Sequence, residues 1–566
     1  RTRIAMFALN GLLLLGFALA VWRAFGSKTG PIMAVGALAF LIIDPTIAAH
    51  LPVALTDLPI ALLGSTAVLL AWAAFRWGKI LDIVLAGLSL GLAVGAKHTG
   101  LIVVVAVAVL GAVMLMRREE NRPRLRRLGQ IFAVLVLGWA TLWGLYRFRF
   151  NESPVGLDQF NRPLATKIAD LHSPFLRNTV SLMVRTHFMP RSYLWGLADI
   201  LHVGVEGRVF PLFFLGHTYL ERAPFYFFPT VLLVKLPLGL IALTLAGLLL
   251  VLKTRDWPGK EPLLVILLFG ALLLLMLIKG TSSYAGVRHG QIVIPPLAVL
   301  AAAGLSVAWE RRSRVVLAGL GIATLAAMVS AIPVVRPWLY YNEIIGTDNA
   351  WRYFSDEGTD FGQRTKEIAA YYHQQLEPKG EIPYLEYVES YAEDARRGIR
   401  SLQADWKAHP ETDTTNIVSG VFMIPATVLL SDPAVDYTPF LADKPIYRFG
   451  VMQVYRGTFN LPGPRASRIY YRALEVEYSD HPDLDKAAEY LSTSLEVFPN
   501  VYYRWIELGN IQLQRGLRDE ALRAYENALK YTPAGNGIVA PLAEQIRRVS
   551  QEDIKSLPTL RNPSLE

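Results

Sequence analysis

The stretch DLPIALLGSTAVLLAWAAFRWGKILDIVLAGLSLGLAVGAKHTGLIVVVAVAVLGAVMLM, residues 57–116, decides the fold of this chain. It contains three apolar runs, 58–76, 80–96 and 100–116, and only three residues separate each run from the next. Helices of such length, at about 1.5 Å per residue, come close to the thickness of a membrane's hydrocarbon core, which is about 30 Å. We therefore predict three consecutive membrane-spanning helices joined by tight corners.

Further apolar runs of similar length surround this stretch, which predicts a polytopic α-helical membrane protein. These runs are 4–22, 31–49, 128–147, 226–252, 262–279, 293–309 and 314–333. The composition agrees, because 53% of the 566 residues are hydrophobic, which excludes an ordinary soluble globule. The chain has no cysteine, which excludes disulfides, thiolate metal sites and a cysteine nucleophile.

Basic residues predict which side of the membrane each corner faces. The net charge is +9, but Lys and Arg fall mostly in corners between apolar runs, which indicates topology rather than nucleic-acid binding. Arginines crowd the corner 117–127, which places that corner in the cytoplasm. Alternation then predicts these external segments: 50–57, 97–99, 148–225, 280–292 and everything after 333. The chain begins at Arg1 on the external side by the same counting, so we expect a further span upstream.

The apolar runs stop after residue 333, so we predict an external water-soluble part. In 334–465, the β-prone runs IPYLEYV and TNIVSGVFMI flank a helical stretch at 360–375 and suggest a small α/β unit. In 466–566, two sets of positions recur 34 residues apart and fit tetratricopeptide repeats. The sets are Tyr471, Leu474, Ala487, Leu491, Ser494 and Pro499, then Trp505, Leu508, Ala521, Tyr525, Ala528 and Pro533. The predicted domains are thus 1–333, 334–465 and 466–566.

His50 and Asp57 begin the series of unusual polar residues in the external corners. They lie seven residues apart in AAHLPVALTD, which is about two helical turns, although Pro52 disfavours one continuous helix. A carboxylate and an imidazole at a membrane surface could bind a metal ion, orient a sugar or move a proton. The alternative is that Asp57 caps the helix that begins there.

Two lysines and a second histidine extend the series. Lys97 and His98 form the corner GAKHTG, where the ammonium could hold a lipid phosphate or extend to the interface. Lys235 lies about two turns inside the run 226–252. A charge at such depth costs about 2.5–3.5 kcal/mol, so we expect a partner, a water-filled cavity or a path to the interface.

Arg288 and His289 lie in the external corner between the runs 262–279 and 293–309. The planar guanidinium of an arginine suits a phosphate, although an ordinary surface arginine would give the same pattern. Together, these residues place cations beside a carboxylate at one face of the bundle. A transferase needs this arrangement when an anionic phosphate leaves and an incoming hydroxyl loses its proton.

Five segments occur in a characteristic order along the chain. They are DPTIAAHLPVALTDLPIALL, AGLSLGLAVGAKHTGL, FFLGHTYLERAPFYFFPTVLLVKLPLGL, YAGVRHGQIVIPPLAVLAAAG and YYNEIIGTDNAWRYFSDEGTDFGQ. Together they resemble bacterial relatives of the protein O-mannosyltransferases, over roughly residues 35–460. The resemblance implies a GT-C-like bundle in the bacterial inner membrane, which takes a sugar from a polyprenyl-phosphate carrier. It passes the sugar to a protein, glycan or lipid acceptor on the periplasmic face, and C-terminal tetratricopeptide repeats that bind a protein are a known addition.

The resemblance also implies roles for individual residues. The main catalytic base belongs to the first external loop, which we expect upstream of Arg1, and Asp57 matches an acidic position at the edge of a later span. We assign Asp57 to catalysis. The expected ligands of the donor phosphate are Lys97, Arg288, His289 and Lys235. The residues expected to orient the sugar, the acceptor or a metal ion are His50, His98, Asp360 and Gln363, and the need for a divalent cation stays open.

The sequence departs from the family pattern on the acceptor side. The family-like DWGQDL is DFGQRT here, with Phe361 for tryptophan and Arg364 for aspartate. Two other functions remain open from the residues alone. A lipid or solute transporter or flippase would need polar residues that thread the bilayer to both faces. An inactive membrane scaffold would only display the repeats.

Overall fold

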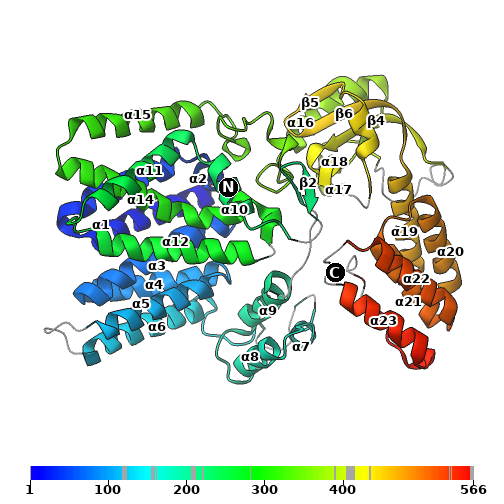
Figure 1. The fold of residues 1–566 in the computed structure, drawn as a ribbon, viewed down its shortest axis with the longest axis horizontal. Coiled ribbons are helices and arrows are strands. Elements are labelled where there is room, and N and C mark those ends of the chain that lie inside the picture. Colours follow the sequence, from blue (N-terminus) through cyan, green and yellow to red (C-terminus); the bar gives the residue numbers. More distant parts are fainter. Residues whose placement is uncertain are drawn as a thin grey trace. The chain divides into compact units, whose positions relative to one another are not determined.

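The computed structural model divides into two compact units, one of residues 1–209 and 222–350 and one of residues 210–221 and 351–566 (Figure 1). Residues 334–350, which were predicted to begin the external part, thus group with the first unit. The structure describes residues 2–117, 124–153, 160, 162–205, 212–219, 222–280, 282–387, 391–402, 415–431, 435–533, 536, 538–560 and 562. Arg118 and Arg122, two of the arginines used to predict topology, lie outside the described residues.

The first unit is helical apart from its connections. Its long helices are α1 (Thr2–Ile43), α3 (Asp57–Trp77), α4 (Ile80–Ala96), α5 (Gly100–Met116), α6 (Arg124–Leu145), α11 (Leu238–Lys253), α12 (Lys260–Lys279), α14 (Ile294–Glu310) and α15 (Arg314–Ala331). The shorter helices are α2 (Pro45–His50), α7 (Leu164–Ala169), α8 (Pro174–Arg185), α9 (Arg191–Ile200), α10 (Phe227–Lys235) and α13 (Val287–Gly290). The bounds predicted for the runs 80–96 and 100–116 are confirmed.

The first helix consists of two arms, because the chain folds back at Gly26. This residue has φ 76° and ψ −178°, a backbone conformation that glycine adopts at little cost. A straight helix would separate Asn10 from the end of α1 by about 50 Å. Instead, Asn10 Nδ2 donates a hydrogen bond of 2.9 Å to the carbonyl oxygen of Leu51. The two arms correspond to the runs predicted at 4–22 and 31–49.

The core of the first unit forms around α3, whose apolar window is entirely buried. This helix packs between α4 and α12 and also contacts α1 and α5 (Figure 1). Glycines allow close contact between helices elsewhere in the bundle. A Cβ atom on Gly304 would lie 2.7 Å from the Cα atom of Gly247, where α14 meets α11. Small residues commonly serve this purpose in membrane helices, since apolar lipid gives no hydrophobic drive for association.

The run 226–252 was predicted as one span, but it forms two helices, α10 and α11, bent by 111°. Pro237 at the junction has no N–H and disfavours a helical conformation for Leu236. The carbonyl of Leu233 would normally accept from the N–H four residues later, which proline lacks. Asn342 Nδ2 supplies the missing donor, at 2.7 Å from Leu233 O and 2.9 Å from Leu236 O. The junction is therefore a satisfied break in the helix.

The helices of the first unit support a multi-pass membrane protein. Six of the described helices are long and apolar enough to cross a membrane, or up to seven if α10 and α11 count as one span. The six are α1, α3, α6, α12, α13 with α14, and α15. In this count α1 is a single helix although it has two arms, and α4 and α5 are shorter apolar helices of 17 residues each.

The second unit contains a four-stranded sheet in the order β3-β4-β6-β5. The strand β3 (Tyr384–Leu385) is parallel to β4 (Ile417–Pro425), and the pairs β4–β6 (Met452–Asn460) and β6–β5 (Tyr447–Phe449) are antiparallel. One face carries an aromatic core that includes Phe422, Phe440, Tyr455 and Phe459. The other face packs on α16 (Thr365–Tyr371), which is shorter than the helix predicted at 360–375.

Three small elements complete the sheet region of this unit. The hairpin β1 (Leu212–Phe214) and β2 (His217–Tyr219) joins it through the bridge between Phe214 and Phe354. The helices α17 (Tyr391–Arg396) and α18 (Ala426–Ser431) are each six residues long. The hairpin lies within the predicted external loop 148–225, so that part of the loop belongs to the second unit.

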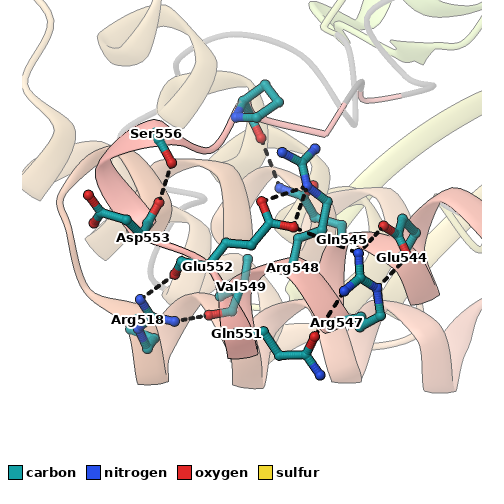
Figure 2. Close-up of polar contacts among 11 residues, drawn as sticks. Arg518, Glu544, Gln545, Arg547, Arg548, Val549, Gln551, Glu552, Asp553 and Ser556 are labelled. Atoms are coloured by element: carbon teal, nitrogen blue, oxygen red, sulfur yellow. Dashed lines mark hydrogen bonds and ion pairs between the residues drawn. The ribbon is translucent and has the colours of Figure 1, made fainter.

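Five helices follow the sheet: α19 (Pro462–Glu477), α20 (Leu484–Val497), α21 (Tyr502–Gln514), α22 (Arg518–Tyr531) and α23 (Val539–Gln551). The ends of α20 and α22 lie 34 residues apart in the sequence, which is the period noted above. Gly509 of α21 lies so close to α22 that a Cβ atom there would be 2.6 Å from the Tyr525 ring. Figure 2 shows how α23 is fixed: Arg518 donates to the carbonyl oxygens of Val549 and Glu552 at its C-terminal end.

Candidate functional site

Tight corners bring distant residues to one end of the first unit. The chain reverses direction after α3, at Gly78, which has φ 70°. The start of α3 at Asp57 and the corner after α4 at Lys97 therefore lie at the same end. That corner is too tight for a side chain at Gly100, where a Cβ atom would lie 2.4 Å from the carbonyl oxygen of Ala93. Glycine at this position thus allows Lys97 to reach Asp57.

Asp57 is the centre of a group that we name the cationic cluster: Asp57, Lys97, Arg288 and His289. Asp57 Oδ1 lies 2.5 Å from Lys97 Nζ and 3.7 Å from His289 Nε2. Asp57 Oδ2 lies 3.8 Å from Arg288 Nε. The Asp57 side chain is 7% exposed, whereas that of Lys97 is 23% exposed and those of Arg288 and His289 are 13% exposed. The cluster is therefore open to a ligand on the side of its cations.

The structure also decides between the two interpretations of Asp57. Thr56 occupies the N-cap position of α3, and no side chain caps that end of the helix. The interpretation of Asp57 as a cap is therefore wrong, and its carboxylate is used for the three basic groups. Its place in the first turn of α3 adds a further favourable interaction, because the helix dipole is positive there.

A single helical turn, α13, positions Arg288 and His289. The turn begins after Gly286, whose φ of 51° and ψ of −133° suit glycine. Gln291 Nε2 donates to the carbonyl oxygen of Arg288 at 2.8 Å. The ring of Tyr284 meets the ring of His289 edge-on, with 5.8 Å between centroids. These contacts hold the turn from both sides, so the two basic side chains reach Asp57 from the same direction.

A second polar group, formed by Asp44, His50 and Lys235, is almost fully buried in the same unit. Lys235 Nζ donates to the carbonyl oxygen of Trp338 at 3.0 Å and lies 3.8 Å from the ring centroid of Tyr341. The hydrogen bond and the cation–π contact offset the cost of burying the ammonium. Lys235 acts on Asp44 and His50 through its charge, which ties the three residues together.

His50 and Asp44 each leave one polar atom open. His50 Nδ1 lies 2.7 Å from the carbonyl oxygen of Thr46, so Nδ1 carries the hydrogen and Nε2 becomes an acceptor. Asp44 Oδ1 accepts from the N–H of Ile47 at 2.8 Å and caps α2. Within the part of the chain that the structure describes, neither His50 Nε2 nor Asp44 Oδ2 has a hydrogen-bond partner. Buried acceptors without partners are typical of binding sites, where a ligand supplies the donor.

His98 follows Lys97 in the sequence but makes different contacts. Its Nε2 atom lies 3.1 Å from the carbonyl oxygen of Tyr193, and the two rings are 4.5 Å apart. Gly196 allows α9 to approach, since a Cβ atom there would lie 2.7 Å from the imidazole. The structure thus places His98 against α9, whereas Lys97 belongs to the cationic cluster.

Asp360 and Gln363 belong to the second unit. Asp360 Oδ1 accepts from the hydroxyl of Tyr387 and from the N–H of Gly362, both at 3.1 Å. Gln363 Oε1 accepts from the N–H of Phe361 at 2.7 Å. Burial raises the pKa of Asp360 to about 6. Asp360 does not cap a helix, because α16 begins five residues later, and both side chains stabilise the turn that precedes this helix.

The cationic cluster suits an anion better than a metal ion. Three basic groups surround its carboxylate, and they would repel a divalent cation. Among the described residues, no group of three or more His, Asp and Glu side chains could hold a metal ion. The same cations could neutralise the charge of a phosphate, with Arg288 and Lys97 as hydrogen-bond donors.

Two residues of this region were missed in the sequence analysis. Asp44 lies inside the run 31–49, where an ionisable residue is by itself a functional candidate, and the following proline marks the start of a helix. Asn342 follows the last apolar run, and nothing nearby in the sequence connects it with α10. Only the missing N–H of Pro237 could have suggested that some distant donor was needed.

The opposite end of the helices carries ordinary charge pairs. Arg117 pairs with Glu261 at 3.0 Å, and their side chains are 45% and 50% exposed. Arg23 and Asp82 form a second pair. The 17 residues of α5 separate Arg117 from the corner at Lys97 by about 25 Å. These pairs are therefore useful controls for the site.

The first unit is thus a multi-pass helical bundle with basic groups gathered around a carboxylate at one end. The family model described as dolichyl-phosphate-mannose-protein mannosyltransferase matches residues 4–152. The matched segment includes Asp57 and Lys97, whereas Arg288 and His289 lie beyond it. The match indicates a membrane glycosyltransferase similar to this family. No curated protein and no solved structure matches the chain.

Proposed function

We propose that the protein transfers a sugar from a polyprenyl-phosphate carrier to a hydroxyl group of a protein, glycan or lipid acceptor. The observation that carries this proposal is the arrangement of Lys97, Arg288 and His289 around Asp57. A sugar phosphodiester of a lipid has its charge at the membrane surface, where the ends of the helices lie. The family match to residues 4–152 supports the same class of donor.

In the proposed reaction, the acceptor oxygen attacks the anomeric carbon while the bond from that carbon to the phosphate oxygen breaks. The phosphate keeps the electron pair, so its negative charge increases in the transition state. Lys97 and Arg288 meet this charge and stabilise the transition state more than the ground state. Asp57 is a positioning residue in this scheme, since it holds both cations before the donor arrives.

The remaining residues of the site have supporting roles in the proposal. His289 contributes a third donor to the phosphate when its imidazole is protonated. Lys235 orders the buried group next to the cluster. His50 Nε2 and Asp44 Oδ2 are open acceptors for a hydroxyl of the sugar or of the acceptor. Asp44 is the carboxylate that we propose for taking the hydroxyl proton, because Asp57 is already held by basic groups.

We infer that the chain lies in a bacterial inner membrane with the cationic cluster and the second unit on the periplasmic side. The positive-inside rule supports this orientation. The chain has no cysteine, so single cysteines can be introduced at the exposed positions Lys79 and Val335. A membrane-impermeant maleimide should label position 335 in intact cells and leave position 79 unlabelled. The reverse pattern would invert the proposed orientation.

The helices α19–α23 are proposed to be tetratricopeptide repeats that bind a protein partner. The 34-residue offset of α20 and α22 supports this assignment. The close contact of Gly509 with Tyr525 gives the pattern its physical basis, because a small residue lets the paired helices approach. Repeats of this kind usually form binding surfaces and do no chemistry.

A transfer assay tests the proposed activity. The purified full-length protein is incubated with a radiolabelled polyprenyl-phosphate sugar and a membrane extract that contains acceptors. We expect label to move to a macromolecular acceptor, and Arg288→Ala to lower the rate by about a hundredfold or more. Arg117→Ala is the matched control, because its guanidinium pairs with Glu261 at the opposite end. Equal rates for the wild-type chain and Arg288→Ala would contradict the role of Arg288.

A further inference from the structure

The last described residues of the chain lie along the C-terminal helices as an extended segment. After α23 and the short turn Ile554–Ser556, residues 557–562 follow without helical or strand assignment. Leu557 is 9% exposed and Asn562 is 3% exposed, whereas Thr559 between them is exposed. The segment is therefore seated on the helices by part of its residues only.

Asn510 of α21 recognises the main chain of this segment. Its Nδ2 atom donates to the carbonyl oxygen of Leu560 at 2.7 Å, and its Oδ1 atom accepts from the N–H of the same residue at 2.8 Å. The hydroxyl of Tyr525 donates to Asn510 Oδ1 at 2.8 Å and fixes the amide orientation. A side-chain amide that binds both polar groups of one residue reads an extended backbone and does not depend on the identity of that residue.

Two further contacts repeat at every second residue. Gln545 Nε2 donates to the carbonyl oxygen of Pro558 at 2.9 Å (Figure 2). Asn562 Nδ2 donates to Glu507 Oε2 at 2.6 Å and to the carbonyl oxygen of Tyr503 at 3.1 Å. Positions 558, 560 and 562 are thus held, which is the two-residue period of an extended chain.

We propose that these helices form a peptide-binding groove, defined by Glu507, Asn510, Tyr525 and Gln545, and that residues 557–562 occupy it as an internal ligand. The partner is an extended segment of another polypeptide with an apolar residue at the place of Leu560 and an amide two residues later. The inference deepens the proposed role of the C-terminal helices in protein binding and rests on it. The internal segment competes with the partner and sets the threshold for its binding.

The chemistry of the groove supports an exchangeable ligand. Recognition through main-chain groups is the mode in which proteins bind extended peptides, with side-chain pockets adding specificity. Residues 557–562 pair with no other strand, so their release breaks only the contacts with the helices. A short segment with few contacts belongs to the parts of a protein that open most readily.

Binding of a labelled peptide of residues 555–564 to the full-length protein in detergent tests the proposal. The variant Leu560→Pro lacks the N–H that donates to Asn510, so its own segment is weakened as a competitor. We expect the peptide to bind Leu560→Pro at least about tenfold more tightly than the wild-type chain, since the tethered segment competes at high effective concentration.

Two modified peptides make the test independent of protein folding. A peptide with an N-methyl group at Leu560 loses the hydrogen bond to Asn510 Oδ1 and should bind about tenfold more weakly. A peptide with an N-methyl group at the exposed Thr559 is the matched control and should bind normally. In the Leu560→Pro background, Asn510→Ala should abolish binding. Asn527→Ala should not, because Asn527 only donates to Arg523 O within α22.

Three outcomes would overturn the proposal. One is a folded Leu560→Pro chain that does not bind the peptide, since the segment would then be a fixed part of the core. Another is equal binding of both N-methyl peptides. The third is a dimer that exchanges residues 557–562 between two copies, which would assign the groove to a second copy. All measurements omit the sugar donor, so failure of the proposed transfer reaction would leave the binding result unchanged.

Discussion

The ammonium of Lys97 lies 2.5 Å from Asp57 Oδ1, so the residue that follows α4 is held by the residue that begins α3. Forty residues separate the pair in the sequence. The pair depends on the hairpin of α3 and α4 and on the glycine that follows the Lys97 corner. Because the ammonium is 23% exposed, it can reach a ligand while the buried carboxylate keeps it in place.

The first prediction concerns Asp57→Asn, which removes the negative charge and leaves Lys97, Arg288 and His289 close together. Their mutual repulsion should lower the free energy of unfolding by about 1–3 kcal/mol, after allowance for the partial exposure of the cations. The transfer rate should fall as well, because the cations lose their positions. Thermal unfolding in detergent measures the first effect. Glu261→Gln, which breaks an exposed pair, should change stability by less than about 1 kcal/mol.

The second prediction concerns the break between α10 and α11. Asn342→Ala leaves the carbonyl oxygens of Leu233 and Leu236 without their donor in a buried region. Each unsatisfied group costs about 1–3 kcal/mol, so the melting temperature should fall clearly. Asn349→Ala, at an exposed position of the same segment, should leave it unchanged. An unaltered melting temperature for Asn342→Ala would show that the junction does not need this donor.

The third prediction concerns the pH dependence of the C-terminal helices. Glu477 and Glu507 are both buried, and burial followed by the charge of Glu507 raises the pKa of Glu477. The folded state therefore binds a proton more tightly than the unfolded state. Its stability is greatest below the ordinary carboxyl pKa of about 4.3 and falls as the pH rises above that value.

Hydrogen exchange of the α19 and α21 amides measures this effect, after correction for the intrinsic exchange rate at each pH. The free energy of opening should decrease from pH 5 to pH 8 in the wild-type chain. Glu477→Gln cannot ionise, so its profile should be flatter. Glu489→Gln, at an exposed position of α20, should follow the wild-type profile. A wild-type profile without any slope would contradict the assignment of a shared proton.

Much of the transmembrane architecture could be predicted from the sequence, because apolar runs and short corners are local signals. The runs 80–96 and 100–116 match α4 and α5 to the residue. The run 226–252 failed, because hydropathy records only that a segment is apolar and not that Pro237 bends it. The strands β5 and β6 were missed, since sequence analysis gave no sign of the turn at Gly450, which has φ 61°.

The candidate site was only partly predictable for a related reason. Lys97, Arg288 and His289 were identified as basic residues in corners, and chain topology then brought them to Asp57. His98 lies next to Lys97 in the sequence, but its side chain packs on Tyr193 instead. Asp44 was hidden within an apolar run, and Asn342 acts on carbonyls more than a hundred residues away. Such long-range pairings depend on tertiary packing that no local pattern encodes.

The central claim is that Lys97 and Arg288 bind the phosphate of the lipid carrier. Equilibrium binding of radiolabelled polyprenyl phosphate to the full-length protein in nanodiscs tests it most directly. We predict that Arg288→Ala and Lys97→Ala each weaken binding by about tenfold or more, as expected for loss of a charge-assisted hydrogen bond. Arg117→Ala should bind as the wild-type chain does. Equal affinities for the wild-type chain, Arg288→Ala and Lys97→Ala would contradict the account.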